Sequence, residues 1–154
     1  MAISVATKRV PDHKGFINKA LEVEAAIGKV PGAKFGDDCC PLKHTFADGL
    51  YIREMRAPKG MVNVSKLHKT THPYFILKGD FTVATETGPV RIRAPYMGIT
   101  KVGTKRVVYF HEDTVWITIH PNPTNETDLR RIEERLIAKS YDELPESVKQ
   151  GRLL

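Results

Sequence analysis

The sequence predicts a mainly β protein, built on one small barrel or sandwich with helical segments at both ends of the chain. Between residues 49 and 121, short runs of alternating apolar and polar residues are separated by turn residues at intervals of about ten. Helical spacing of apolar residues occurs only before and after this segment. The 154 residues also suit a single domain, whose usual size is about 100–150 residues.

The central segment, residues 49–121, contains eight stretches with the strand pattern. A turn with the sequence Glu-Thr-Gly-Pro at residues 86–89 separates two of them and is typical of a β-hairpin. The predicted strands are 50–55, 62–68, 74–77, 81–85, 90–94, 98–102, 106–110 and 114–120. On the last strand Val115, Ile117 and Ile119 share one face, which we expect to be the core face. The other face of that strand carries Trp116, Thr118 and His120.

Residues 1–48 are predicted to form an N-terminal arm with one short helix over residues 15–27. Apolar residues recur there at helical spacing, and Gly28 is well placed to end the helix. The arm is too short and too poor in apolar residues to form a core of its own. We therefore expect it to pack on the barrel or on a neighbouring subunit.

Residues 122–154 are predicted to form a C-terminal helical extension. Leu129, Ile132 and Leu136 fall on one helical face, and Ser140 and Glu143 form a capping-box pattern that would begin a last short helix.

The chain is basic, with a net charge of +6, which raises the prospect of an acidic partner. The basic residues are scattered among acidic ones, so we favour a solvated surface over a functional basic patch. The densest group comprises Lys101, Lys105 and Arg106, with Arg91 and Arg93 nearby in sequence. No apolar run approaches the ~20 residues that span a bilayer. The first residues lack a signal-peptide pattern, so synthesis in the cytoplasm is the default expectation.

A framework of glycines and histidines carries a resemblance to a known family. Gly60 and Gly79 bracket a segment in which His72 lies seven residues before the second glycine and His68 four residues earlier. A second turn at residues 102–104 is followed by Arg106. The spacing resembles the two motifs of cupins, which implies a jelly-roll barrel. The resemblance places Lys66, His68, His72 and Arg106 where cupins usually carry three His and one Glu as metal ligands.

The wider string of motifs resembles small cupin-like proteins of tailed bacteriophages and prophages. That resemblance implies a component of the virion or tail. The matching segments are 40–41, His44, 46–51, 68–70, 103–106, 111–116 and 119–120.

Three uses of the barrel interior stay open from the sequence. His68, His72 and His120 could converge on one divalent zinc, iron, manganese or nickel ion, because neutral imidazoles suit these metals. Lys66 and Arg106 oppose a cation, and with Trp116 they could instead form an anion or ligand pocket. The third alternative is a structural interior without a ligand.

The degraded ligand set, the flanking helices and the phage resemblance predict a non-enzymatic structural or assembly protein, acting as a homo-oligomer with other virion proteins. The alternative is a metal-dependent cupin enzyme, a dioxygenase or isomerase acting on a small molecule, with His111 as a further candidate ligand. A sugar- or anion-binding module is a third hypothesis.

Membranes and nucleic acid are not expected as partners. The adjacent Cys39 and Cys40 are interpreted as free thiols, because a vicinal disulfide is strained. The expected location is the host cytoplasm or the virion.

Overall fold

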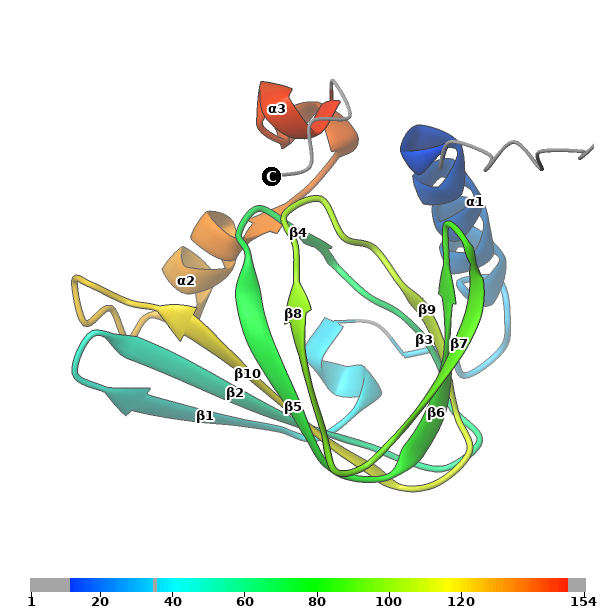
Figure 1. The fold of residues 1–154 in the computed structure, drawn as a ribbon, viewed down its shortest axis with the longest axis horizontal. Coiled ribbons are helices and arrows are strands. Elements are labelled where there is room, and N and C mark those ends of the chain that lie inside the picture. Colours follow the sequence, from blue (N-terminus) through cyan, green and yellow to red (C-terminus); the bar gives the residue numbers. More distant parts are fainter. Residues whose placement is uncertain (1–11, 35, 150–154) are drawn as a thin grey trace, which may run out of the picture.

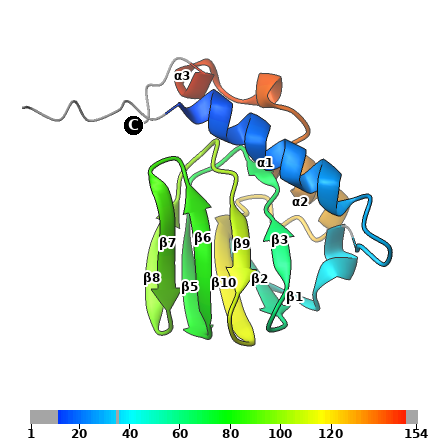
Figure 2. The same ribbon diagram turned by 90° about the vertical axis from the view of Figure 1, so that its right-hand side faces the viewer.

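Two antiparallel sheets face each other and form the two halves of a barrel (Figures 1 and 2). The computed structural model describes residues 12–34 and 36–149 of the chain. The five-stranded sheet has the order β1 (Leu42–Ala47), β2 (Leu50–Ala57), β10 (Thr114–Pro121), β5 (His72–Lys78) and β8 (Tyr96–Thr100). The four-stranded sheet has the order β3 (Val62–Val64), β9 (Val107–Phe110), β6 (Asp80–Thr85) and β7 (Gly88–Arg93). A short pair, β4 (Leu67–His68) with β11 (Ile137–Ala138), lies at one end.

The strand pairing is that of a jelly roll. One ladder pairs β2 with β10 and β3 with β9, and a second ladder pairs β5 with β8 and β6 with β7. Each ladder passes from one sheet to the other, and the pairs β10–β5 and β9–β6 join the two ladders. This arrangement confirms the predicted mainly β jelly-roll barrel with helices at both ends.

Gly79 allows the chain to pass from β5 in one sheet to β6 in the other. Its φ of +116° lies in the region that side chains rarely adopt. A Cβ atom at this position would lie 2.2 Å from Thr114 Oγ1 and 2.7 Å from Thr114 Cα. The bend therefore needs glycine both for its backbone conformation and for the close approach of β10.

The barrel core consists of aromatic and aliphatic side chains from both sheets. Trp116 on β10 stacks on Tyr74 and on Phe81, with 5.0 Å between ring centroids in each case. The expectation that Val115, Ile117 and Ile119 form the core face was wrong. These residues alternate along β10 with the buried Trp116, so they lie on the outer face of the strand. The aromatic ring of Trp116 faces the interior of the barrel, and the branched residues of β10 face outward.

The terminal segments pack together at one end of the barrel. Helix α1 (His13–Ile27) begins two residues before the predicted start, because Asp12 caps it by accepting a hydrogen bond from the Gly15 amide. Ile17 of α1 forms a buried cluster with Leu67, Ala138, Leu144 and Val148. The expected packing of the arm on the barrel is present, and Figure 2 shows α1 crossing the ends of β6, β9 and β3.

The predicted boundary between arm and barrel falls inside a hairpin. Strand β1, within the expected arm, pairs residue by residue with β2, so the barrel sheet begins at Leu42. A 3-10 turn, Gly36–Cys39, precedes it.

The C-terminal extension contains α2 (Leu129–Leu136) and α3 (Glu146–Lys149). Ile132 and Leu136 of α2 are buried, as the helical spacing predicts. The capping box was wrong at Ser140, whose side chain makes no capping hydrogen bond where the 3-10 turn Tyr141–Glu143 begins. Glu143 instead accepts a hydrogen bond from the Lys139 amide at 3.0 Å. Among the described residues, no helix has the length and apolar character needed to cross a bilayer.

Candidate ligand cavity in the barrel

A cavity of about 500 Å³ lies between the two sheets, and we call it the lumen cavity. Its size is in the range of small-molecule sites, roughly 300–1,000 Å³. Its apolar wall includes Met55, Met61, Val108, Phe110 and Trp116. Its polar wall includes Arg53, Ser65, Lys66, His68, His72, Thr100, Arg106 and Thr118. An apolar wall facing a few polar groups is the arrangement that orients a small ligand.

Arg106 is the most distinctive polar group of the lumen cavity. It lies directly before β9, where its amide donates a hydrogen bond to Ser65 Oγ at 2.8 Å. Its Nη1 donates to Thr100 Oγ1 at 3.2 Å, and its guanidinium carbon lies 5.3 Å from the centroid of the Tyr74 ring. Burial lowers the pKa of Arg106, but a guanidinium keeps its charge in proteins. Within residues 12–34 and 36–149, no acidic side chain forms an ion pair with it.

Three histidines lie in a row near Arg106, and two of them, His72 and His120, are buried while His68 is half-buried. The ring centroids of His68 and His72 are 4.7 Å apart, and those of His72 and His120 are 4.2 Å apart. His72 Nδ1 bonds to the Thr70 carbonyl at 3.2 Å, and His120 Nε2 bonds to Thr118 Oγ1 at 3.0 Å. Among the described residues, His68 Nδ1, His72 Nε2 and His120 Nδ1 have no hydrogen-bond partner. The three predicted ligands are therefore neighbours, each with one free ring nitrogen.

Burial keeps these imidazoles neutral. It lowers the pKa of His68 well below the ordinary value, with smaller effects of His72, His120 and Arg106 in the same direction. It lowers the pKa of His120 to about 3, and it also lowers the pKa of His72. All three side chains are therefore neutral at pH 7, and each can serve as a hydrogen-bond donor or acceptor.

The three histidines meet where two cavities adjoin. His72 lines the lumen cavity, His120 lines a second cavity of about 40 Å³ beneath α2, and His68 lines both. Over the described part of the chain, no group of three or more His, Cys, Asp or Glu side chains is placed to hold a metal ion. Arg106 also places a positive charge close enough to lower the pKa of His68. Metal binding by His68, His72 and His120 stays a prediction.

The three residues predicted for an anion pocket, Lys66, Arg106 and Trp116, all line the lumen cavity. Lys66 forms an ion pair with Glu133 of α2, so its charge is balanced within the chain. Trp116 supplies an apolar wall. Of these three residues, Arg106 is the one that carries a charge without an acidic partner among the described residues.

The sequence reasoning missed Thr100 and Tyr74 as contributors to this site. Both lie on predicted strands, and both contact the Arg106 side chain. Strand position could have indicated Tyr74 as a residue of the interior, because it lies on the same face of β5 as His72 and Ile76. Their pairing with Arg106 depends on how the two sheets close, which strand spacing does not reveal.

The other singled-out residues have partners outside this site. His44 Nδ1 bonds to the Tyr51 hydroxyl at 2.8 Å, and His111 Nε2 bonds to Thr82 Oγ1 at 2.7 Å. Cys39 and Cys40 form no vicinal disulfide, as predicted, and their sulfur atoms lie 3.4 Å apart at the cavity wall.

The group of basic residues singled out in the sequence does not gather into a patch. Arg91 and Arg93 bind the Asp80 carboxylate, with Arg91 in a bidentate pair of 2.8 Å hydrogen bonds. These hydrogen bonds hold the pKa of Asp80 below its usual range. Lys105 is nearly buried and bonds to Glu24 of α1 at 3.0 Å. The separate partners favour structural roles for these three basic residues.

Comparisons with known proteins bear on the fold alone. No family model matches the chain, and no curated protein matches it in sequence. Similar solved structures include KdgF from Halomonas sp. (14% identity, 63% of this chain and 88% of that one, TM-score 0.49). An acetylacetone dioxygenase from Acinetobacter johnsonii is 14% identical over 62% of this chain and 80% of that one, with a TM-score of 0.45. A cupin-2 domain containing protein from Shewanella frigidimarina is 11% identical over 53% of this chain and 79% of that one, with a TM-score of 0.44. At these values the assignment of the jelly roll rests on the strand pairing described above.

Proposed function

We propose that the barrel binds a small carboxylate with an apolar body in the lumen cavity, and that Arg106 is its anchor. The observation that carries this proposal is the charge of Arg106. It is a half-buried cation on the wall of a cavity of about 500 Å³, with no carboxylate partner among the described residues. A bound carboxylate would supply the missing negative charge.

The chemistry of the surrounding wall favours a carboxylate over other anions. A guanidinium matches the two oxygens of a carboxylate in a planar, bidentate contact. The apolar part of the cavity lining, with Trp116, Phe110 and Met55, suits an apolar or aromatic body, which a phosphate ion lacks. The free Nε2 of the neutral His72 adds a further hydrogen-bonding group. The site therefore calls for one charged end and one apolar end in the same molecule.

The energetics argue against a purely structural interior. A fully buried ion without a partner costs several kcal/mol, and a half-buried one such as Arg106 carries part of that cost. The hydrogen bond to Thr100 and the contact with Tyr74 offset only part of this cost. A methionine or leucine at position 106 would fill the same space without this cost, so the arginine makes physical sense as part of a binding site.

Calorimetric titration with benzoate, succinate and inorganic phosphate, with and without EDTA, tests the proposal. We expect saturable binding of benzoate, weaker binding of the other two, and no effect of EDTA. Arg106→Gln should abolish benzoate binding. Arg130→Gln, at an arginine whose side chain is 79% exposed on α2, is the matched control and should bind as the wild type does. Absence of benzoate binding, or equal binding by Arg106→Gln, would refute the proposal.

The roles predicted from the phage resemblance need separate tests. Membership of a virion or tail rests on that resemblance, and mass spectrometry of purified particles would detect the chain there. The metal-dependent enzyme predicts a stoichiometric transition metal in the native protein, which elemental analysis would measure. Neither role is needed for carboxylate binding at Arg106.

A further inference from the structure

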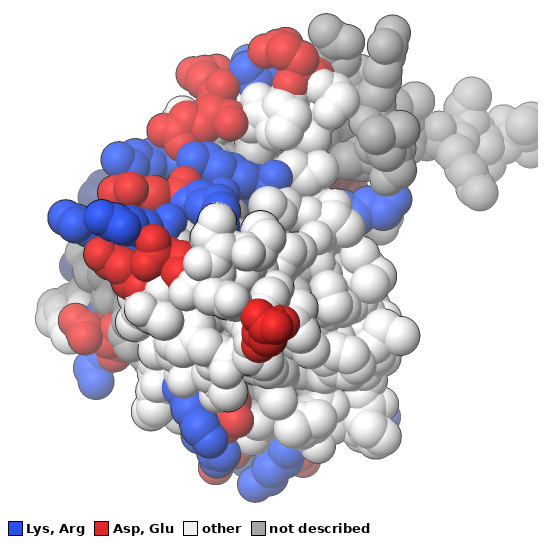
Figure 3. All heavy atoms as spheres, turned by 90° about the vertical axis from the view of Figure 1, so that its left-hand side faces the viewer, with Lys and Arg blue, Asp and Glu red and all other residues white. Residues whose placement is uncertain are grey.

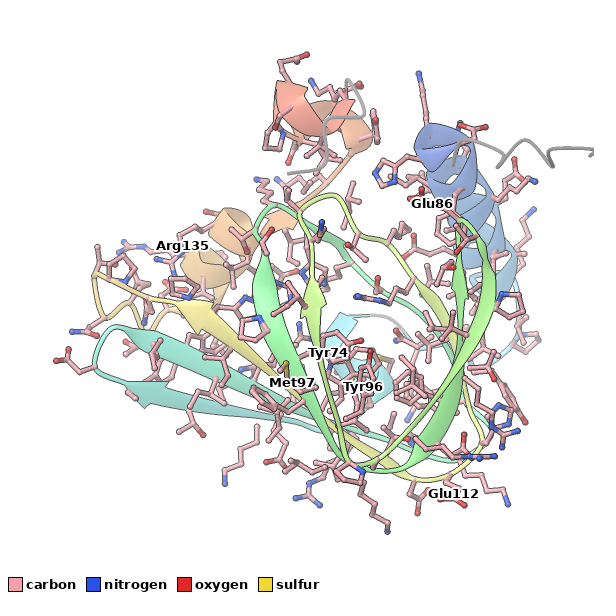
Figure 4. All side chains as sticks on the ribbon, in the orientation of Figure 1. Tyr74, Glu86, Tyr96, Met97, Glu112 and Arg135 are labelled. Atoms are coloured by element: carbon pink, nitrogen blue, oxygen red, sulfur yellow. The ribbon has the colours of Figure 1, made fainter. Side chains whose placement is uncertain are left out.

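His72 carries a hydrogen-bonding atom without a partner on the wall of the lumen cavity. The residue begins β5, lies on the same inward face as Tyr74 and Ile76, and is only 2% exposed. Figure 4 shows Tyr74 pointing from β5 into the space between the two sheets. Among the described residues, His72 Nε2 has no hydrogen-bond partner. Because His72 lines the lumen cavity, a molecule bound there can reach this atom.

The hydrogen bond at the other ring nitrogen determines the tautomer of His72. Nδ1 lies 3.2 Å from the carbonyl oxygen of Thr70, and a carbonyl oxygen can only accept a hydrogen bond. Nδ1 must therefore carry the hydrogen atom and donate it. Burial lowers the pKa of His72, so the ring is neutral at pH 7 and holds a single N–H group. Nε2 is then an acceptor, and its missing partner must be a donor.

Thr100 brings this acceptor close to the guanidinium group of Arg106. Thr100 of β8 is the cross-strand partner of His72, so the Cβ atoms of the two residues lie about 4.5–5.5 Å apart. Thr100 Oγ1 also accepts a hydrogen bond from Arg106 Nη1 at 3.2 Å. The charge of Arg106 is close enough to lower the pKa of His72 further. A cation and a hydrogen-bond acceptor therefore lie next to each other on the cavity wall.

We propose that the lumen cavity is specific for 2-hydroxycarboxylates with an apolar body, and that His72 Nε2 accepts a hydrogen bond from the 2-hydroxyl group. The inference rests on the proposed function, because Arg106 must hold the carboxylate. In a 2-hydroxycarboxylate, the carbon atom that bears the carboxylate also bears the hydroxyl group. One molecule can thus present both groups to two adjacent side chains, with its apolar body against Trp116 and Phe110.

The buried acceptor selects against other carboxylates. An acid without a hydroxyl group excludes water from His72 Nε2 and leaves the acceptor unpaired, which weakens binding. A second carboxylate accepts but does not donate, so it cannot pair with Nε2. The ammonium group of a 2-amino acid does donate, but the positive charge of Arg106 opposes a second cation beside it. A neutral hydroxyl group is the donor that fits.

The charges on the outer surface are balanced, in contrast to that of Arg106. At the left of Figure 3, Lys and Arg side chains lie among Asp and Glu side chains. On α2, Arg131 pairs with Glu126 at 3.4 Å. Within residues 12–34 and 36–149, Arg106 forms no such ion pair. An organic acid therefore has more to gain at Arg106 than at these surface arginines.

Calorimetric titration of the full-length protein with mandelate and phenylacetate tests the inference. The two acids have the same carbon skeleton and differ by the 2-hydroxyl group. We expect one enantiomer of mandelate to bind the wild type about tenfold or more tightly than phenylacetate does. Phenylglycine, which has an ammonium group in place of the hydroxyl group, should bind more weakly than mandelate.

Two variants of His72 separate hydrogen bonding from shape. The amide nitrogen of His72→Asn can still donate to Thr70, but no acceptor replaces Nε2, so the preference for mandelate should fall below about threefold. His72→Gln places an amide oxygen near the position of Nε2 and should restore much of the preference. His111→Asn is the matched control, because His111 bonds to Thr82 outside the lumen cavity, and it should keep the wild-type preference. Circular dichroism and thermal unfolding would verify that each variant folds.

The outcomes distinguish this inference from the proposed function. If the wild type binds mandelate and phenylacetate equally and Arg106→Gln binds neither, the specificity for a hydroxyl group is refuted while the carboxylate site stands. If the wild type binds neither acid, both are refuted. A preference for mandelate that persists in His72→Asn would also overturn the inference, because the hydroxyl group would then be bound elsewhere.

Discussion

Replacement of Arg106 by methionine should stabilise the ligand-free protein. The guanidinium is half-buried beside Thr100 and Tyr74 and has no acidic partner in the described residues. Methionine keeps much of the apolar stem of arginine and introduces no charge. The substitution therefore removes the desolvation cost of a half-buried ion while leaving most of the packing in place.

The magnitude follows from three contributions. Loss of the half-buried charge returns part of the several kcal/mol that a fully buried ion costs, about 3–4 kcal/mol. Against this, the hydrogen bond to Thr100 stabilises by about 1.5 kcal/mol and the contact with the Tyr74 ring by about 1 kcal/mol. We expect the free energy of unfolding to rise by about 1–2 kcal/mol, which corresponds to an increase in Tm of about 2–8 °C for a chain of this size.

Urea unfolding followed by tryptophan fluorescence suits this measurement, because Trp116 is the only tryptophan and stacks in the core. Arg130→Met, at an exposed position of α2, is the control and should change the free energy of unfolding by less than about 0.5 kcal/mol. If Arg106→Met instead destabilises the protein by more than about 1 kcal/mol, Arg106 is fully compensated inside the folded chain. The reasoning that assigns it to a ligand would then fail.

Two further predictions concern the buried histidines and the bend of the barrel. The unfolded chain takes up protons on histidine near pH 6.5, whereas burial lowers the pKa of His68, His72 and His120 in the folded state. The free energy of unfolding should therefore fall from pH 7 to pH 5, by at most about 1.4 kcal/mol per pH unit for each histidine, and His120→Gln should reduce the slope in urea titrations. A slope unchanged by His120→Gln would contradict the burial of a neutral imidazole there. Gly79→Ala should cost about 3 kcal/mol or more because its Cβ would collide with Thr114, whereas Gly88→Ala, also at positive φ but with open space, should cost about 1 kcal/mol. Equal losses for the two glycine variants, measured by thermal unfolding, would show that the contact with Thr114 does not limit the bend.

The strand pattern predicted the barrel because its signals are local. Alternation and turn residues identify each strand separately, and the helical spacing of Ile132 and Leu136 does the same for α2. The orientation of β10 was beyond such signals, since its inward face carries Thr118 and His120 beside Trp116 and is the less apolar of the two. The choice between Trp116 and Ile117 depends on the width of the interior, which is set by the closure of two sheets.

The candidate site was predictable only in part, because its members come from strands far apart in the sequence. Spacing placed Lys66, His68, His72 and Arg106 together, and all four line the lumen cavity. It did not show that Glu133 of α2 balances Lys66, or that His120 lines a second cavity beneath α2. Both facts depend on where the C-terminal extension packs.

A crystal structure of the protein with 4-bromobenzoate would test carboxylate binding in the lumen cavity most directly. Anomalous scattering locates the bromine atom independently of the protein. We predict one bromine position between Trp116 and Phe110, with the carboxylate in bidentate contact with Arg106. An unoccupied lumen cavity in the presence of saturating ligand, or a carboxylate bound away from Arg106, would contradict the account.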